Sequence, residues 1–343
     1  MPEFVPNQYN HLQADHFSPE HFHRPDTVDQ PLYVICPIFN PIRFRSRWKL
    51  YKDFEEQVLR FKEAVLVTIE CSFGDRAPAL GQMPGRHIYI HVRSSHEAWI
   101  KENLINRAIQ SLPADWQYVA WVDPDISFAR PDWVGETIQQ LQHYKFVQMF
   151  SQANDLGPNY ESIKSYTSFG YCFLNPGKVP AFDRKGYYTV TSKGKGYWHP
   201  GFAWAARREA INHVGGLIDW GILGGGDTFM AYCIAGMLEK RIMPNSLGLN
   251  GVRWLQEWQN RCNQYILQDL GYVEGLINHH WHGSRKNRAY WDRGQILTDA
   301  KFNPETDIKK DWQGIWQLNT NNIALRNGIR SYLRARNEDG IDL

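Results

Sequence analysis

The sequence predicts an α/β protein built on a doubly wound, mostly parallel sheet. Two observations point to this class. Short apolar runs such as Leu32–Ile38 have the composition of strands buried on both faces. Between these runs, apolar residues recur at three- and four-residue steps, as they do in amphipathic helices. Because strands that alternate with helices assemble into parallel sheets, we expect a Rossmann-like core.

The first half of the chain carries this alternation in order. The expected strands are 32–38, 64–70, 87–92, 118–122 and 146–151. The expected helices are 48–61, a helix capped by Ser95 that carries Leu104, Ile105 and Ala108, and 133–143. Each strand is followed by a turn at the carboxyl edge of the sheet, where open α/β sheets bind their ligands.

Past residue 151 the apolar periodicity is poor up to about Trp198, while Gly, Tyr and Trp are frequent. We interpret this stretch as binding loops laid over the sheet. Helices are expected at 208–213 and 228–238, and a helical tail at 312–336. Residues 1–30, rich in His and Pro, are expected to form an irregular arm.

Composition excludes several classes of protein. The net charge of +2 gives no global field for nucleic acid or membrane binding. Five cysteines without a C-x-x-C pair argue against a disulfide framework and a zinc site, and favour a reducing compartment. No run approaches the roughly 20 apolar residues needed to cross a bilayer, and no signal peptide is apparent. A cytoplasmic protein without a membrane span is expected.

Asp123 and Asp125 directly follow the buried strand 118–122. Two carboxylates one residue apart at the end of a strand can bind a divalent cation, which can in turn hold a diphosphate. Asp125 is the carboxylate more strongly expected to bind the metal directly, because Asp123 can instead hydrogen-bond a ribose or a metal-bound water.

Two other strand ends carry polar groups. Pro37, Phe39 and Asn40 form a turn after the first strand, with Arg43 and Arg45 available for phosphates. An ordinary turn with a solvated basic face explains them too. Glu70 ends the second strand, where it can accept hydrogen bonds from a nucleobase or ribose, or simply face solvent.

The second half adds two clusters. Asp227 follows three glycines, including Gly225 and Gly226, that let a ligand approach the backbone closely. Asp227 is either a helix N-cap or a catalytic base, and the two roles are compatible. The other cluster spans His279, His280 and His282, one of which can complete a metal site, followed by Arg285 and Lys286 for phosphates.

In this order the motifs resemble the GT-A glycosyltransferases, over about residues 32–295. Pro37-Ile-Phe-Asn40 is similar to their Pro-x-Tyr-Asn turn, and Asp123-Pro-Asp125 matches their Asp-x-Asp metal motif. Pro41–Arg47 is similar to the Pro-Phe-Arg-x-Arg nucleotide loop of β-1,4-galactosyltransferases. Trp220-Gly-Ile-Leu-Gly-Gly-Gly-Asp227 is similar to their Trp-Gly-Trp-Gly-Gly-Glu-Asp-Asp stretch, with Gly226 in place of the Glu.

The resemblance implies a metal-dependent, inverting transfer of a sugar from a nucleotide-diphosphate donor, favouring UDP, to a hydroxyl. Asp227 is then the base, Mn²⁺ or Mg²⁺ the cofactor, and His282 the third metal ligand. It also implies a nucleotide-binding half (31–150), an acceptor half (151–300) and a C-terminal helical extension (301–343). Acceptor-side residues are Trp198, Gly201, Trp220, Gly225 and Gly226.

The acceptor stays open between a glycan and a hydroxymethylated base in phage DNA. Arg326, Arg330 and Arg334 form one basic helical face, which is either solvated or in contact with an acidic acceptor. Two other classes compete with glycosyl transfer. They are a metal-dependent nucleotidyl- or phosphoryl-transfer enzyme and a non-catalytic sugar-binding protein.

Overall fold

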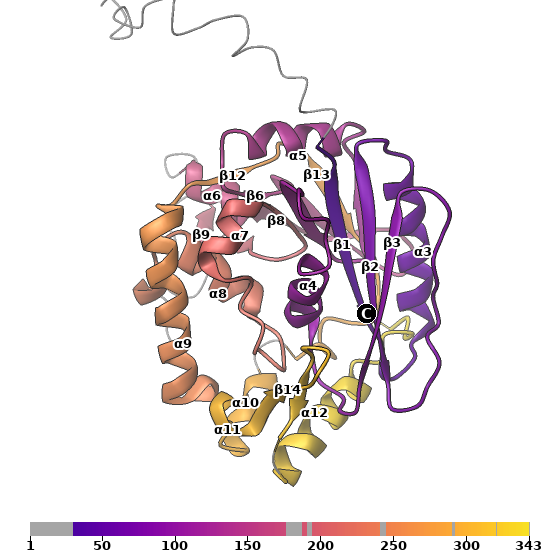
Figure 1. Ribbon diagram of the computed structural model, residues 1–343, viewed down its shortest axis with the longest axis vertical. Coiled ribbons are helices and arrows are strands. Elements are labelled where there is room, and N and C mark those ends of the chain that lie inside the picture. The colour runs from indigo at the N-terminus through magenta and orange to yellow at the C-terminus, as the bar shows by residue number, and fades with distance from the viewer. Residues whose placement is uncertain are drawn as a thin grey trace, which may run out of the picture.

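A seven-stranded sheet forms the centre of the molecule, with strand order β12-β6-β11-β4-β1-β2-β3 (Figure 1). The computed structural model describes residues 30–175, 187–190, 194–240, 245–289, 292–319 and 321–342. The expected arm lies outside these residues, apart from residue 30. The strands of this sheet are β1 (Leu32–Phe39), β2 (Ala64–Phe73), β3 (His87–Ser94), β4 (Tyr118–Val122), β6 (Phe146–Gln148), β11 (Ala203–Arg207) and β12 (Leu270–Tyr272).

The sheet is mostly parallel, which confirms the predicted fold class. β1 pairs in parallel with β2 and β4, and β2 pairs in parallel with β3. Only β11 runs antiparallel to its neighbours β4 and β6. All eight residues of β1 are buried, as a strand covered on both faces requires. The carboxyl ends of β1 and β4 therefore meet at one edge of the sheet.

Helices cover both faces of the sheet. On one face, α3 (Arg45–Leu59) and α5 (Trp133–Leu141) pack against alternate residues of β1 such as Val34. On the other face, α4 (Lys101–Ile109), α7 (Arg208–Val214) and α8 (Gly226–Ile234) pack against residues such as Ile35. The two apolar layers fix the positions of the strands and therefore of their carboxyl ends.

The remaining helices lie around the sheet and below its carboxyl edge (Figure 1). They are α6 (Phe169–Leu174), α9 (Gly248–Arg261), α10 (Arg293–Asp299), α11 (Pro304–Asp307) and α12 (Ile323–Ala335), with short turns η2 (Leu238–Lys240), η3 (Asn245–Leu247) and η4 (Cys262–Ile266). A small hairpin of β14 (Ile308–Lys310) and β15 (Trp316–Leu318) precedes α12. The predicted helical tail is therefore helical only in its second half.

A second sheet corrects the interpretation of residues 151–198 as loops. It has the order β5-β13-β7-β8-β10-β9. Its strands are β5 (Ile126–Phe128), β7 (Gln152–Leu156), β8 (Ser162–Ser168), β9 (Tyr187–Val190), β10 (Gly194–His199) and β13 (Leu276–His279). Exposed or half-buried residues alternate with buried ones along β7. The strand is therefore polar enough in sequence to be taken for a loop, although it pairs with neighbouring strands.

Two smaller predictions were also wrong. Ser95 does not cap a helix, because α4 begins six residues later, at Lys101, and is preceded by Ile100. Ser95 instead uses its backbone N–H to donate to Gln317 in β15. The strand expected at 146–151 stops at Gln148, where its side chain turns to hydrogen-bond the backbone of Gly170 and His199.

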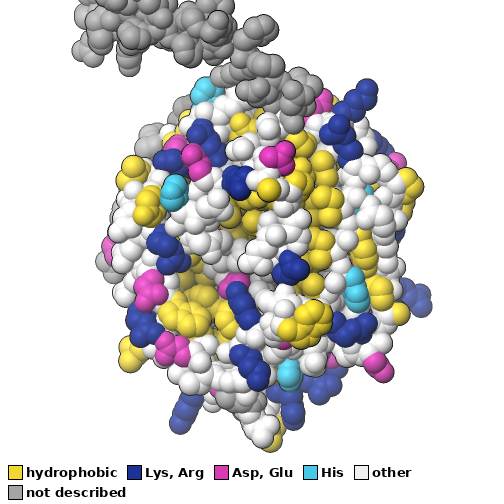
Figure 2. All heavy atoms as spheres, in the orientation of Figure 1, with side chains coloured by type: hydrophobic (Ala, Val, Ile, Leu, Met, Phe, Trp, Pro, Cys, Tyr) yellow, Lys and Arg dark blue, Asp and Glu magenta, His cyan; other side chains and the backbone are white. Residues whose placement is uncertain are grey.

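All five cysteines are buried and free, and no disulfide forms among them. Among the described residues, no helix is both long and apolar enough to span a membrane. Figure 2 shows Lys and Arg interspersed with Asp and Glu on one face, in line with the small net charge.

Trp133 tests the packing of α5 on the sheet. Its indole is 1% exposed, stacks on Phe128 with ring centroids 4.3 Å apart and meets Phe61 edge-on. We expect Trp133→Ala to lower the free energy of unfolding by about 3–5 kcal/mol, measured by urea denaturation, because it leaves a cavity in the core. The matched control Trp312→Ala removes an indole that is 92% exposed and should cost less than about 0.5 kcal/mol. Equal effects would contradict this packing.

Candidate active site

A cavity of about 840 Å³ opens at the carboxyl ends of β1 and β4. Pro37 and Phe39 of β1, Asp123 and Asp125 after β4, and the turn before α8 all line it. The predicted doubly wound topology places the ligand site at this edge of the sheet.

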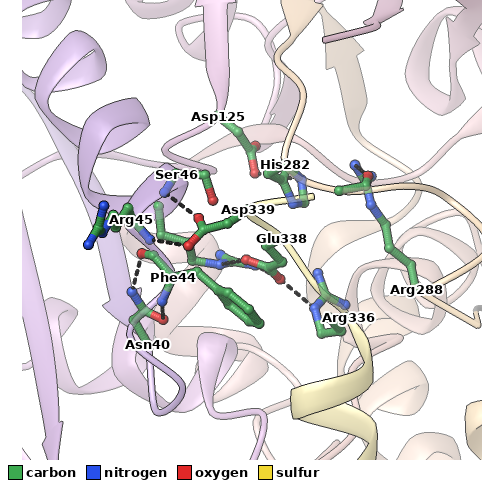
Figure 3. Close-up of polar contacts among 12 residues, drawn as sticks. Asn40, Phe44, Arg45, Ser46, Asp125, His282, Arg288, Arg336, Glu338 and Asp339 are labelled. Carbon is green, nitrogen blue, oxygen red and sulfur yellow. Dashed lines mark hydrogen bonds and ion pairs between the residues drawn. The ribbon is translucent and has the colours of Figure 1, made fainter. Parts of the chain in front are cut away.

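Asp125, His279 and His282 form a buried cluster at one side of the cavity. One ligand atom from each residue lies within 4.8 Å of the other two. The Nε2 atom of His282 is 3.0 Å from Oδ2 of Asp125 and 3.2 Å from Nε2 of His279. Figure 3 shows the side chains of Asp125 and His282 pointing toward one another. A carboxylate and two imidazoles facing one point are a common set of metal ligands.

The hydrogen bonds of this cluster fit a divalent cation. His279 faces Asp155 through Nδ1 at 2.7 Å, and a neutral ring that donates there turns the lone pair of Nε2 toward Asp125 and His282. Burial lowers the pKa of His282 to about 3, so this ring is neutral at pH 7. Among the described residues, Oδ1 of Asp125 has no hydrogen-bond partner although it is buried. A bound cation would satisfy all of these acceptor atoms.

Asp155 fixes the orientation of His279. It lies opposite His279 in the parallel pairing of β7 and β13. Arg285 and Tyr166 also donate to its carboxylate, at 2.6 and 3.0 Å. Burial raises the pKa of Asp155, but the hydrogen bond to His279 and the charge of Arg285 outweigh it and hold the pKa well below its ordinary value. A carboxylate behind a ligating histidine orients the ring and increases its basicity.

Asp123 lies apart from this cluster and pairs with a cation. Its Oδ1 atom is 2.5 Å from Nζ of Lys101, at the start of α4. Burial lowers the pKa of Lys101, but Asp123 and two further carboxyls outweigh it and raise the pKa above its ordinary value. The structure thus brings Asp125, His282 and His279 together, with Asp123 bound to Lys101 beside them.

Asp227 lines the same cavity, in the first turn of α8. The residue that caps α8 is Gly225, and Asp227 accepts instead from the backbone N–H of Thr228 at 2.7 Å. A Cβ atom on Gly201 would lie 2.5 Å from Oδ2 of Asp227, so only glycine leaves room for this carboxylate. The carboxylate is therefore held at the cavity wall by backbone contacts.

Glu102 is a carboxyl of the cavity that the sequence did not single out. It lies in the first turn of α4 and is 8% exposed. A Cβ atom on Gly226 would lie 3.0 Å from its Cδ and Oε1 atoms. Burial raises the pKa of Glu102, Lys101 lowers it and Asp227 raises it, to about 7.

Cations and aromatic rings complete the walls. The cationic side chains that line the cavity are Arg47, Lys101, Lys164, Arg285, Arg293 and Arg336. Trp198 and Trp220 contribute apolar faces. Lys286, predicted beside Arg285, is exposed and does not line the cavity. His280 also faces away, toward the Ser127 hydroxyl at 2.8 Å.

Glu70, Asn40 and Arg43 line a separate, smaller pocket beside the cavity. Glu70 is already engaged, because it accepts from the backbone N–H groups of Ala79 and Leu80 and from the Tyr89 hydroxyl. Asn40 closes the turn after β1 through two hydrogen bonds to Phe44 (Figure 3). These residues shape the edge of the sheet next to the cavity.

The segment after α12 returns to this edge. Glu338 is buried and pairs with Arg47 and Arg336, while Asp339 accepts from the backbone N–H groups of Arg45 and Ser46 at the start of α3 (Figure 3). Burial raises the pKa of Glu338, but Arg47 and Arg336 outweigh it and hold the pKa well below its ordinary value. The basic loop that the sequence predicts to bind a nucleotide (residues 41–47) is therefore already paired with carboxylates of the segment after α12.

The basic face predicted on the last helix is partly neutralised. Arg330 and Arg334 both pair with Glu97, at 3.2 and 2.8 Å. The Glu97 carboxylate is only 12% exposed, so it holds both guanidinium groups against the loop before α4. This arrangement favours a structural role for the face over contact with an acidic acceptor.

No protein-family model and no curated protein sequence matches the chain. Solved structures do match it. Drosophila β1,4-galactosyltransferase 7 in complex with manganese, UDP-galactose and xylobiose is 10% identical, with a TM-score of 0.37, over 88% of this chain and 98% of that one. A Pyrobaculum calidifontis mannosyltransferase with GDP-mannose and Mn²⁺ is 17% identical, with a TM-score of 0.36, over 70% of this chain and 63% of that one.

A third structure belongs to another kind of transferase. It is 4-diphosphocytidyl-2C-methyl-D-erythritol synthase from Anaerococcus prevotii, 12% identical, with a TM-score of 0.33, over 72% of this chain and 89% of that one. The first two proteins are of the type that the sequence motifs resemble. All three TM-scores are below 0.5.

Proposed function

We propose that this chain is a metal-dependent glycosyltransferase that moves a sugar from a nucleotide-diphosphate donor to a hydroxyl acceptor. One observation carries the proposal. The Asp125–His279–His282 cluster and the carboxylate of Asp227 line one cavity at the carboxyl edge of a doubly wound sheet. The first supplies a metal site and the second a proton acceptor.

Asp125, His279 and His282 would hold the metal. When bound, it would neutralise the charge that develops on the leaving diphosphate. Two imidazoles beside a single carboxylate favour Mn²⁺ over Mg²⁺, which prefers an all-oxygen shell. Asp123 keeps Lys101 charged at the cavity, where the ammonium group can bind a ribose or phosphate oxygen.

The cationic side chains support a diphosphate donor. Arg47, Arg285 and Arg293 line the cavity together with the metal cluster, where Arg47 also pairs with Glu338 and Arg285 with Asp155. Guanidinium groups bind phosphate oxygens in pairs and remain charged at any physiological pH. A UDP-sugar is our favoured donor, since the loop that carries Arg47 has the motif resemblance to the uridine-nucleotide loop of β-1,4-galactosyltransferases.

Asp227 is the proposed general base. The acceptor oxygen forms a bond to the anomeric carbon as the bond from that carbon to the diphosphate oxygen breaks. The acceptor's proton passes to the Asp227 carboxylate, and the diphosphate leaves with the bonding electrons. This single displacement inverts the anomeric carbon. Base assistance of this kind accelerates a reaction by about 10²–10⁴-fold.

Mutation of the histidines tests the metal site. We expect His279→Ala and His282→Ala each to weaken Mn²⁺ binding at least tenfold, measured by isothermal titration. Asp155→Asn should weaken it by about 10- to 100-fold, because it leaves His279 without its orienting carboxylate. His280→Ala is the matched control, since its ring faces Ser127, and should bind Mn²⁺ as the wild type does. If His280→Ala alone loses the metal, the ligand set is wrong.

Asp227→Asn tests the base. The variant should bind UDP-galactose in the presence of Mn²⁺ as tightly as the wild type. It should transfer the sugar from this donor about 10²–10⁴-fold more slowly. Asp219→Asn is the control, because that carboxylate pairs with Lys310 and does not line the cavity. A fully active Asp227→Asn enzyme would rule out Asp227 as the base.

The nucleotide products released distinguish a glycosyltransferase from a nucleotidyltransferase and from a sugar-binding protein. Glycosyl transfer releases a nucleoside diphosphate, whereas nucleotidyl transfer from a nucleoside triphosphate releases pyrophosphate. A sugar-binding protein releases neither. Incubation with UDP-galactose, UDP-glucose and GDP-mannose, and separately with nucleoside triphosphates, each with and without Mn²⁺, followed by chromatography of the nucleotides and an assay for pyrophosphate, distinguishes these outcomes.

A further inference from the structure

We propose that Glu102 is a second acceptor-binding carboxyl and that, together with Asp227, it selects a carbohydrate acceptor with two neighbouring hydroxyls. The inference rests on the proposed glycosyl transfer and names its acceptor class. It follows from where α4 places this side chain, from its hydrogen-bonding capacity and from the glycine that faces it.

Glu102 is built into the cavity wall. Its carboxyl fills the space that a side chain at Gly226 would need, 3.0 Å from the ideal Cβ position. Gly226 directly precedes Asp227, so the carboxyls of Glu102 and Asp227 border the same part of the cavity. α4 thereby supplies an acidic group at the point where the motif before Asp227 carries only glycine.

The carboxyl of Glu102 retains unused acceptor capacity. Over the part of the chain that the structure describes, no side chain of another residue donates a hydrogen bond to it. The neighbouring ammonium of Lys101 is bound to Asp123 instead. Buried polar atoms are nearly always hydrogen-bonded, so a carboxyl that is 8% exposed and borders a cavity accepts there from water or from a donor of a bound ligand.

Two neighbouring carboxyls match two hydroxyl donors. Repulsion from Asp227, added to burial and opposed by Lys101, raises the pKa of Glu102 to about 7. Hydrogen bonds donated by the O–H groups of a ligand relieve the repulsion between the two carboxyls without adding charge. A sugar ring offers adjacent hydroxyls, one to lose its proton to Asp227 and one to donate to Glu102. The hydroxymethyl group of a modified base offers a single hydroxyl.

The walls around these carboxyls suit a sugar as well. Trp198 and Trp220 line the cavity, and indole faces pack against the apolar faces of sugar rings. Two arginines of the basic helix, Arg330 and Arg334, are held by Glu97 rather than turned toward an acidic polymer. These contacts favour a glycan over duplex DNA as the acceptor.

The experiment compares acceptors in the wild type and in Glu102→Gln. Enzyme with Mn²⁺ and UDP-galactose, UDP-glucose or GDP-mannose is offered xylobiose, methyl glycosides, 1-propanol and a duplex containing 5-hydroxymethylcytosine. We expect transfer to a glycoside and none to the propanol or the duplex. Wild-type hydrolysis of a donor, which uses water, reports on the proposed function independently of any acceptor.

At pH 8, where the Glu102 carboxyl is mostly ionised, Glu102→Gln should raise the KM for the glycoside at least tenfold, because a charged acceptor of a hydrogen bond is replaced by a weaker, neutral one. Mn²⁺-dependent donor binding should remain at the wild-type level, because the donor site lies with the metal cluster and not with Glu102. Glu97→Gln is the matched control, since this carboxylate holds Arg330 and Arg334 outside the cavity, and should leave the KM unchanged.

Three outcomes would overturn the inference. They are a Glu102→Gln enzyme with the wild-type KM for the glycoside, transfer to the hydroxymethylated duplex but to no glycoside, and donor hydrolysis without transfer to any glycoside. Absence of donor hydrolysis in the wild type instead counts against the proposed function itself.

The pH dependence of stability gives a second readout of the same variant and shows that it folds. A carboxyl whose pKa is raised from 4.5 to about 7 in the folded state binds a proton more tightly there than in the unfolded chain. Folding is therefore penalised progressively as the pH rises from about 4.5 through 7. Lys101, Asp123 and Asp227 are the charged groups that face it.

We expect Glu102→Gln to melt at a higher temperature than the wild type at pH 8 and not at pH 4. A lower melting temperature at pH 8 would show that Glu102 is a stabilising residue.

Discussion

A group of carboxylates around the carboxyl end of β4, most of them buried, is the constraint on which the rest of the structure depends. An ionised group without a partner in such a place costs several kcal/mol, so each must meet a cation or a set of donors. α4 brings Lys101 to Asp123, and Arg285 after β13 reaches Asp155. The segment after α12 returns Glu338 to Arg47. Segments far apart in the sequence are thereby drawn to one sheet edge, and the same pairing leaves Asp125 for a cation that is not part of the chain.

The cavity divides its chemistry between its two sides. One side holds the Asp125 cluster, with its second layer of Asp155 and Arg285. The other side holds Asp227 and Glu102, delivered by α8 and α4. The proposed charged donor and hydroxylated acceptor would suit such a division, because a group that loses a diphosphate and a group that loses a proton need opposite electrostatic surroundings. Gly201 leaves room for the carboxylate of Asp227, and Gly226 leaves room for that of Glu102.

Strong local signals made the first half of the fold and part of the site predictable from the sequence. β1 and β2 are almost wholly buried, so continuous apolar runs revealed them, and Asp125, Asp227 and His282 stood in recognisable motifs. The second sheet was missed because only alternate residues of its strands are buried. Asp155 escaped for the same reason, since it faces His279 only through the register of β7 with β13. Glu102 has no local signal, because its role depends on a glycine more than a hundred residues away.

The return of the chain from α12 to α3 has a consequence for how the molecule forms. Asp339 bonds to the backbone of Arg45 across 294 residues of sequence, and Glu338 reaches Arg47 across 291. Closing so long a loop costs little more stability than closing one half its length, but contacts between remote residues form slowly. During synthesis the β1–α3 region leaves the ribosome long before these carboxylates exist. The arginine loop beside the cavity therefore acquires these two carboxylate partners only after residues 338 and 339 have been synthesised.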